Sequence, residues 1–237
     1  MNKNPFSKSS FANAVTSLNV FSGFVSIIYA SQGNFRMAAV FIIVAAIFDT
    51  LDGIVARLLK TSSRFGVELD SLSDVVSFGA APSFLVYQAH AYQFGFWGVA
   101  ASSLLLIFGA MRLARFNINV SDLNTKGDFT GLPIPLQAIT ISLLIFSFHT
   151  ENGMQEPYNY IVLPLVVLLS FLMVSNIRYN ALPKFKDKKL KLKILFFIVL
   201  SIALVLTIIT NGQILFYIFL LIILFGVLRQ VYNLIFS

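Results

Sequence analysis

The sequence is poor in three kinds of residue, and each shortage narrows what the protein can be. Cysteine is absent, which excludes disulfide bonds and thiolate metal sites. Charged residues make up only 11% of the 237 positions, against about 25% in soluble domains. Tryptophan occurs once, although phenylalanine occurs 25 times. With 57% hydrophobic residues and a mean hydropathy of +0.84, the composition is that of a membrane protein with several spans.

Acidic residues are also scarce, so the net charge is +7. The 17 basic residues lie between apolar segments and do not form a patch with interleaved aromatic side chains. This distribution favours anionic membrane lipid, lipid phosphates or a nucleotide as partners, and it argues against nucleic acid.

Apolar segments long enough to cross a bilayer, which takes about 20 residues, recur along the chain. They predict an all-α integral membrane protein with about eight transmembrane helices. The predicted spans are roughly 13–31, 35–59, 70–90, 94–115, 133–149, 157–176, 191–210 and 213–234. The loop at 116–132 is long enough to cover a site, and we expect Gly127 and Gly131 to permit movement there.

The basic residues also predict an orientation. If the N-terminus is cytoplasmic, Arg36 is the only one of the 17 basic residues that falls in an outer loop. The positive-inside rule therefore favours a multi-pass protein of the inner (cytoplasmic) membrane with both termini inside.

The most specific pattern in the chain is D-x2-DG-x2-AR-x8-G-x3-D-x3-D, which runs from Asp49 to Asp74. Asp49 and Asp52 are three residues apart and Asp70 and Asp74 are four apart, so each pair shares one face of a helix. A carboxylate within a span costs about 2.5–3.5 kcal/mol unless it is neutralised. Two hard cations, Mg²⁺ or Mn²⁺, would neutralise the four aspartates, and the pattern predicts a two-metal site at the cytoplasmic surface.

Two other interpretations of the four aspartates are open. The acids could be structural partners of Arg57 and Arg64, although two arginines cannot neutralise four carboxylates. They could instead line the path of a divalent-cation transporter, although both spans are apolar beyond the aspartates.

This pattern resembles the signature of the CDP-alcohol phosphatidyltransferase family at every defined position. Further strings are similar to the phosphatidylserine synthase branch of that family, and the resemblance covers about residues 10–180. These strings are Leu69-Asp70-Ser71-Leu72-Ser73-Asp74-Val75-Val76-Ser77-Phe78-Gly79 with Ala81-Pro82, Arg112-Leu113-Ala114-Arg115-Phe116-Asn117, and Phe129-x-Gly131-Leu132-Pro133-x-Pro135. A further string, Asn13-x2-Thr16-x2-Asn19, is similar to the polar start of the first core helix in the family as a whole.

The resemblance implies a role for each matching position. Asp49 and Asp70 bridge both metals, Asp52 completes the first site, and Asp74 completes the second and acts as general base. The expected contacts to CDP-diacylglycerol are Thr16, Asn19, Gly53, Ala56, Arg57, Ser63 and Gly66. From their chemistry, we also expect Arg112, Arg115 and Asn117 to bind the acceptor, although the two arginines could equally be membrane anchors at a helix end.

The resemblance further implies a six-helix core, with two additional C-terminal helices, and a homodimer. The predicted segments are 1–12, an N-terminal interfacial segment; 13–180, a catalytic transmembrane core; and 181–237, a basic cytoplasmic loop with the two extra helices. The expected reaction transfers a phosphatidyl group from CDP-diacylglycerol to the hydroxyl of L-serine, giving phosphatidylserine and CMP. The same chemistry with glycerol 3-phosphate or inositol as acceptor is the alternative.

Overall fold

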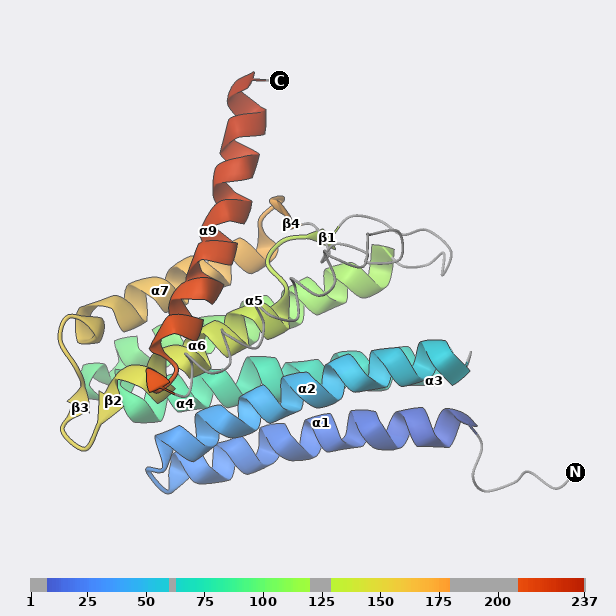
Figure 1. Cartoon of the computed structure of the whole chain (residues 1–237), viewed down its shortest axis with the longest axis horizontal. Coiled ribbons are helices and arrows are strands. Elements are labelled where there is room, and N and C mark those ends of the chain that lie inside the picture. Colours follow the sequence, from blue (N-terminus) through green and yellow to red (C-terminus); the bar gives the residue numbers. More distant parts are fainter. Residues whose placement is uncertain (1–7, 60–62, 120–128, 180–208, 237) are drawn as a thin grey trace, which may run out of the picture.

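The structure is a computed structural model that describes residues 8–59, 63–119, 129–179 and 209–236, and it is almost entirely helical (Figure 1). The two-residue strands form two antiparallel pairs, β1 (Phe129–Thr130) with β4 (Arg178–Tyr179) and β2 (His149–Thr150) with β3 (Gly153–Met154). The helices are α1 (Lys8–Ser31), α2 (Phe35–Leu59), α3 (Arg64–Asp74), η1 (Val75–Ala80), α4 (Ala81–Ala89), η2 (Ala91–Phe94), α5 (Gly95–Asn119), α6 (Ile134–Phe148), α7 (Tyr158–Val174) and α9 (Gln213–Phe236).

The prediction of an all-α membrane protein is confirmed. Helices occupy the first six predicted spans and the last one. Within the described ranges, four helical stretches are long and apolar enough to cross a membrane, and α6 and α7 are shorter apolar helices. The predicted span at 191–210 lies almost wholly outside the described residues, so the number of spans stays a prediction.

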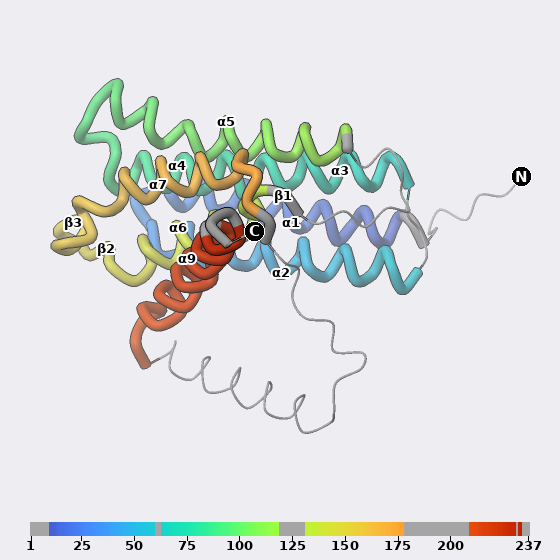
Figure 2. Tube along the Cα trace, turned by 90° about the horizontal axis from the view of Figure 1, so that it is seen from above, coloured from blue at the N-terminus to red at the C-terminus, as the bar shows by residue number. Residues whose placement is uncertain are grey.

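Three helical pieces, α3, η1 and α4, follow one another without a break and form one rod. α1 packs along both α2 and this rod, while α5 lies against α4, η1 and α7 (Figures 1 and 2). α2 and the rod run in opposite directions (Figure 1). However, α3 packs mainly against α1, and α2 approaches the rod chiefly at α4. The facing sides of α2 and α3 are thus not packed tightly together, which leaves room for polar side chains between them.

The middle of the rod, η1, has π-helical geometry and begins directly after Asp74. Pro82 supplies a physical reason, because it has no N–H to bond with the Phe78 carbonyl four residues earlier. The N–H of Ala81 bonds instead to the Val76 carbonyl, five residues earlier. Such π-turns are rare and frequently mark functional sites.

Gly131 connects β1 to α6 and is held tightly in place. Its φ is +84°, and its N–H donates to the Ile177 carbonyl at 2.8 Å. A Cβ at this position would lie 2.1 Å from the Met173 carbonyl oxygen, so only glycine fits. The expectation that Gly131 permits movement was therefore wrong, because this glycine allows a close backbone contact. Gly127 lies outside the described residues.

The N-terminal and C-terminal helices differ in how they join the bundle. α1 is a single helix from Lys8, so it runs through the predicted boundary between residues 12 and 13. α9 packs against α6, and the rest of α9 projects away from the bundle (Figure 1). The division of the chain into three segments stays a prediction.

Candidate functional site

Three aspartates from two helices converge at one end of the bundle. Carboxylate oxygens of Asp49 on α2 and of Asp70 and Asp74 on α3 all lie within 4.8 Å of one another. Asp74 is buried, and the other two are half-buried. We call these three residues the acidic cluster, and the end of the bundle that holds them the acidic end.

Asp52, the fourth aspartate of the pattern, lies beside the acidic cluster in an adjoining cavity of about 130 Å³. Asp52 is only 6% exposed, and its Oδ2 atom has no hydrogen-bond partner among the described residues. Asp70 lines the same cavity, so this residue joins the cavity to the acidic cluster.

The cavity lies between α1, α2 and the start of α3. Five of the seven residues predicted to contact the lipid nucleotide line it, and three further residues line it that the prediction left out. The five are Thr16, Gly53, Ala56, Ser63 and Gly66, and the three are Ala12, Asn13 and Val67. Asn13 opens the Asn13-x2-Thr16-x2-Asn19 pattern, so its helical spacing from Thr16 was the signal that could have identified it.

The other two residues predicted to contact the nucleotide lie outside this cavity. The Arg57 Nε atom donates to the Gly53 carbonyl at 2.7 Å, which lays this exposed side chain back along its own helix. Asn19 is fully buried, and its Nδ2 atom donates to Asp74 Oδ1 at 3.5 Å. Asn19 therefore contacts the acidic cluster directly.

The first turn of α3 forms one wall of the cavity. Ser63 is the N-cap, and its hydroxyl oxygen accepts a hydrogen bond of 3.0 Å from the Gly66 N–H. A Cβ on Gly66 would lie 3.2 Å from that hydroxyl oxygen, which explains the need for a small residue. Because the partial positive charge at a helix N-terminus attracts anions, this wall is suited to phosphate.

The three residues expected to bind the acceptor are placed differently by the structure. Arg112 is buried within electrostatic reach of Asp74, and in the part of the chain that the structure describes its Nε atom has no hydrogen-bond partner. Arg115 donates from Nη1 to the Val174 carbonyl at 2.9 Å, at the end of α7. Asn117 exchanges hydrogen bonds of 3.0 and 3.2 Å with the hydroxyl of Ser71.

The donor set of the acidic end fits a metal ion. Three carboxylates crowd together, and the neighbouring Asp52 has an unpartnered buried oxygen. Oxygen donors of this kind select hard cations such as Mg²⁺ and Mn²⁺. The acidic cluster could therefore bind a divalent cation.

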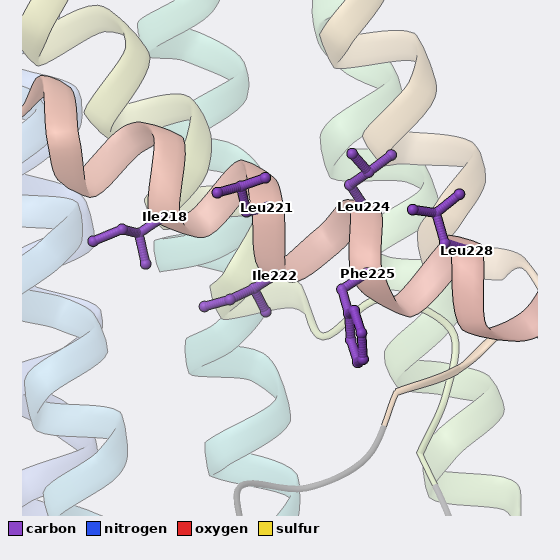
Figure 3. A pocket seen from close by; sticks show the side chains of 6 residues that line it. All are labelled: Ile218, Leu221, Ile222, Leu224, Phe225 and Leu228. Carbon is purple, nitrogen blue, oxygen red and sulfur yellow. The ribbon is translucent and has the colours of Figure 1, made fainter. Parts of the chain in front are cut away.

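A second hollow, of about 460 Å³, lies along α9 and has a different character (Figure 3). The described residues that line it are all apolar and all belong to this one helix: Ile218, Leu221, Ile222, Leu224, Phe225 and Leu228. It offers no group for acid–base chemistry or for metal binding, and its surface suits the acyl chains of surrounding lipid.

Fold and site together define a class: a multi-pass helical membrane protein with an oxygen-rich acidic centre beside a polar cavity. Comparison with known proteins then identifies the family. Residues 9–172 match the family described as CDP-alcohol phosphatidyltransferase. The chain belongs to this family.

Curated relatives agree with this assignment. The chain is 44% identical to a CDP-diacylglycerol–serine O-phosphatidyltransferase of Helicobacter pylori, over 82% of this chain and 81% of the relative. It is 36% identical to the Bacillus subtilis protein of the same name, over 73% of this chain and 89% of that protein. An archaetidylserine synthase of Methanothermobacter thermautotrophicus is 40% identical over 68% of this chain and 66% of its own length.

Proposed function

We propose that the protein transfers a phosphatidyl group from CDP-diacylglycerol to the hydroxyl of L-serine, releasing CMP. The observation that carries the proposal is the acidic cluster beside a polar cavity, in a chain 44% identical to a serine phosphatidyltransferase. A divalent-cation transporter accounts for the carboxylates but not for the family or for the adjoining cavity.

Asp74 is the candidate general base. It is the most buried member of the acidic cluster, and Asn19 holds one of its oxygens. In the proposed reaction, Asp74 takes the proton of the serine hydroxyl as the serine oxygen attacks the phosphorus that carries diacylglycerol. A new P–O bond to serine forms, the bond to the CMP oxygen breaks, and CMP leaves with that electron pair.

Two divalent cations, Mg²⁺ or Mn²⁺, are proposed as cofactors, with Asp49, Asp52, Asp70 and Asp74 as their ligands. When bound, such cations neutralise the diphosphate and the charge that develops on the leaving CMP.

The cavity between α1, α2 and α3 is proposed to hold the nucleotide headgroup. Its volume of about 130 Å³ admits only part of a large ligand, so the acyl chains stay in the bilayer. Gly53 and Ala56 bring no bulk to its wall, and the α3 N-terminus faces the phosphates. Arg57, exposed next to this wall, can reach the same phosphates by leaving the Gly53 carbonyl.

Arg112 is the proposed partner of the serine carboxylate. It is close to Asp74, where the serine hydroxyl must lie, and no described residue is a hydrogen-bond partner of its Nε atom. Arg115 and Asn117 already bind α7 and α3, respectively, and are proposed to brace the site rather than contact serine.

We further propose that the acidic end faces the cytoplasm, in the inner membrane, and that the protein forms a homodimer. In this Cys-free chain, a Lys186→Cys variant should label only from the cytoplasmic side and an Asn152→Cys variant only from outside. Labelling of Lys186→Cys from outside in intact cells would reverse the orientation.

The test of the proposed activity uses purified protein, CDP-diacylglycerol and Mg²⁺ or Mn²⁺ with labelled serine, glycerol 3-phosphate, inositol or serinol. Labelled phosphatidylserine should form with equimolar CMP, while serinol, which lacks the carboxylate, should react poorly. A lipid product from glycerol 3-phosphate or inositol, with none from serine, would refute serine as the acceptor. No CMP release with any alcohol would refute the enzyme.

A further inference from the structure

The π-turn η1 has contacts on three sides that the reaction described above does not use. On one side, the Ser77 hydroxyl donates to the Asn19 carbonyl of α1 at 2.9 Å. At the same contact, a Cβ on Gly23 would lie 2.7 Å from Ser77 Cα, so the two backbones touch. On a second side, a Cβ on Gly79 would meet Leu106 of α5 at 3.1 Å.

The third contact comes from α6 and is polar. Gln137 is fully buried, and its Nε2 atom donates to the Phe78 carbonyl at 2.5 Å, across 59 positions of sequence. The Phe78 carbonyl is the one that loses its usual helical donor because residue 82 is proline. Gln137 thus supplies from a neighbouring helix the hydrogen bond that Pro82 cannot make.

The contact matters for the site because η1 begins at the residue after Asp74. The rotation of the rod at this point decides which way Asp74 faces. Asn19 links the two features, since its carbonyl holds Ser77 and its side chain holds Asp74. A buried polar side chain is costly unless it is hydrogen-bonded, so a glutamine in this apolar part of α6 calls for a reason beyond packing.

We propose that Gln137 is a positioning residue for Asp74, acting through the Phe78 carbonyl and the π-turn. Loss of its amide donor leaves a buried carbonyl unpaired, and the rod relaxes by changing the helical turn that sets Asp74. Small displacements of a reacting group can reduce turnover strongly, so the effect falls on kcat and not on substrate affinity. This proposal rests on the proposed role of Asp74.

The test is a Gln137→Met variant, which keeps the size of the side chain and removes the donor. Its kcat should fall roughly 10- to 100-fold, while the KM values for serine and CDP-diacylglycerol change less than about 3-fold. The matched control is Thr140→Val, one turn further along α6. Thr140 is also fully buried, but its hydroxyl donates to the Leu136 carbonyl of its own helix at 2.7 Å. This control should keep kcat within about 2-fold of the parent.

A second substitution tests whether Gln137 acts through the Phe78 carbonyl. Pro82→Ala restores an N–H that can reach the Phe78 carbonyl, so Gln137→Met should cost much less kcat in a Pro82→Ala background. Equal losses in both backgrounds would overturn the assignment to this carbonyl, and a Gln137→Met kcat equal to that of Thr140→Val would overturn the proposal outright. If Gln137→Met does not fold, Ser77→Ala probes the α1 side of the same turn, and an unchanged kcat there would also overturn it.

These assays use whichever alcohol the acceptor panel identifies. An error in the choice of serine is therefore distinguishable from an error about Gln137. If the parent protein releases no CMP with any alcohol, it is the proposed function that fails.

Discussion

At the acidic end of the bundle, three carboxylates of like charge converge; at the opposite end, aromatic rings stack. The Phe148 ring lies 3.6 Å from that of Tyr158 and 5.6 Å from that of Phe216, joining α6, α7 and α9. Phe148 and Phe216 are almost fully buried. We call Phe148, Tyr158 and Phe216 the aromatic end. The same set of antiparallel helices therefore carries well-packed contacts at one end and unfavourable electrostatics at the other.

The difference indicates that the two ends of the helices serve different purposes, the aromatic end stability and the acidic end function. Within a membrane, helix association depends on close packing, which the aromatic end supplies. Crowded carboxylates oppose folding unless a cation neutralises them, so the acidic end is retained for function at a cost in stability. Substitutions at the two ends should then affect different quantities.

The largest effect on stability is expected at the aromatic end. Phe148→Ala should lower the free energy of unfolding by roughly 3–5 kcal/mol, because it opens a cavity where three helices meet. Turnover of the protein that remains folded should stay within about 3-fold of the parent. Thermal unfolding in detergent measures the first quantity, with Phe24→Ala as control because Phe24 is 55% exposed on α1. Equal losses of stability in Phe148→Ala and Phe24→Ala would contradict a stabilising role for the aromatic end.

The largest effect on activity is expected at the acidic end. Replacing Asp49, Asp52, Asp70 or Asp74 singly by Asn should lower turnover at least about 100-fold, or roughly 2.7 kcal/mol in barrier height. The melting temperature without added metal should stay the same or rise, because a repelling charge is removed. Glu68→Gln is the control, an exposed acid on α3 two positions before Asp70. Near-normal turnover in any two of the four variants contradicts the two-metal site.

The two arginines of α5, Arg112 and Arg115, should have different effects on serine binding and on stability. Arg112→Ala should raise the serine KM about 10- to 150-fold, since a charge-assisted hydrogen bond contributes about 1.5–3 kcal/mol. The KM for CDP-diacylglycerol should change far less. Arg115→Ala should instead lower the melting temperature and leave the serine KM within a few-fold, because Arg115 bonds to the end of α7. The reverse result would make Arg115 the residue that binds serine.

The smallest effect is expected for Asn117→Ala. This change removes the hydrogen bonds to Ser71, next to Asp70, and should cost about 0.5–1.5 kcal/mol of stability. The serine KM should change less than about 3-fold, as measured by steady-state kinetics over a range of serine concentrations. An increase as large as that expected for Arg112→Ala would show that Asn117 contacts the acceptor.

The convergence of Asp49, Asp70 and Asp74 could be predicted from the sequence because the information for it is local. Spacings of three and four residues put each aspartate pair on one helix face, and the short connection from Arg57 to Gly66 brings the pairs together. The difference between Arg112 and Arg115 could not be predicted in this way. Both arginines lie on one face of α5. Which of them bonds to the end of α7 depends on where that end lies in the folded protein.

Two further features could not be predicted from the sequence because they depend on contacts between residues far apart in the chain. Pro82 is visible in the sequence, but the donor that compensates for it is on Gln137, two helices later. From the sequence, we expected Gly131 to permit movement of the loop. In the structure, the backbone of Met173, more than 40 positions away, lies so close to Gly131 that no side chain fits there. In each case the decisive neighbour comes from a different helix.

Direct Mn²⁺ binding tests, without any assay of turnover, whether the acidic end holds divalent cations. Electron paramagnetic resonance of free Mn²⁺, titrated into purified parent protein and the Asp70→Asn variant, gives the number and affinity of bound ions. We expect saturable binding of two ions per chain in the parent, a loss of at least one of them in Asp70→Asn, and parent-like binding in Glu68→Gln, as a two-metal site requires. Binding that is absent in the parent, or that is the same in Asp70→Asn as in the parent, would contradict it.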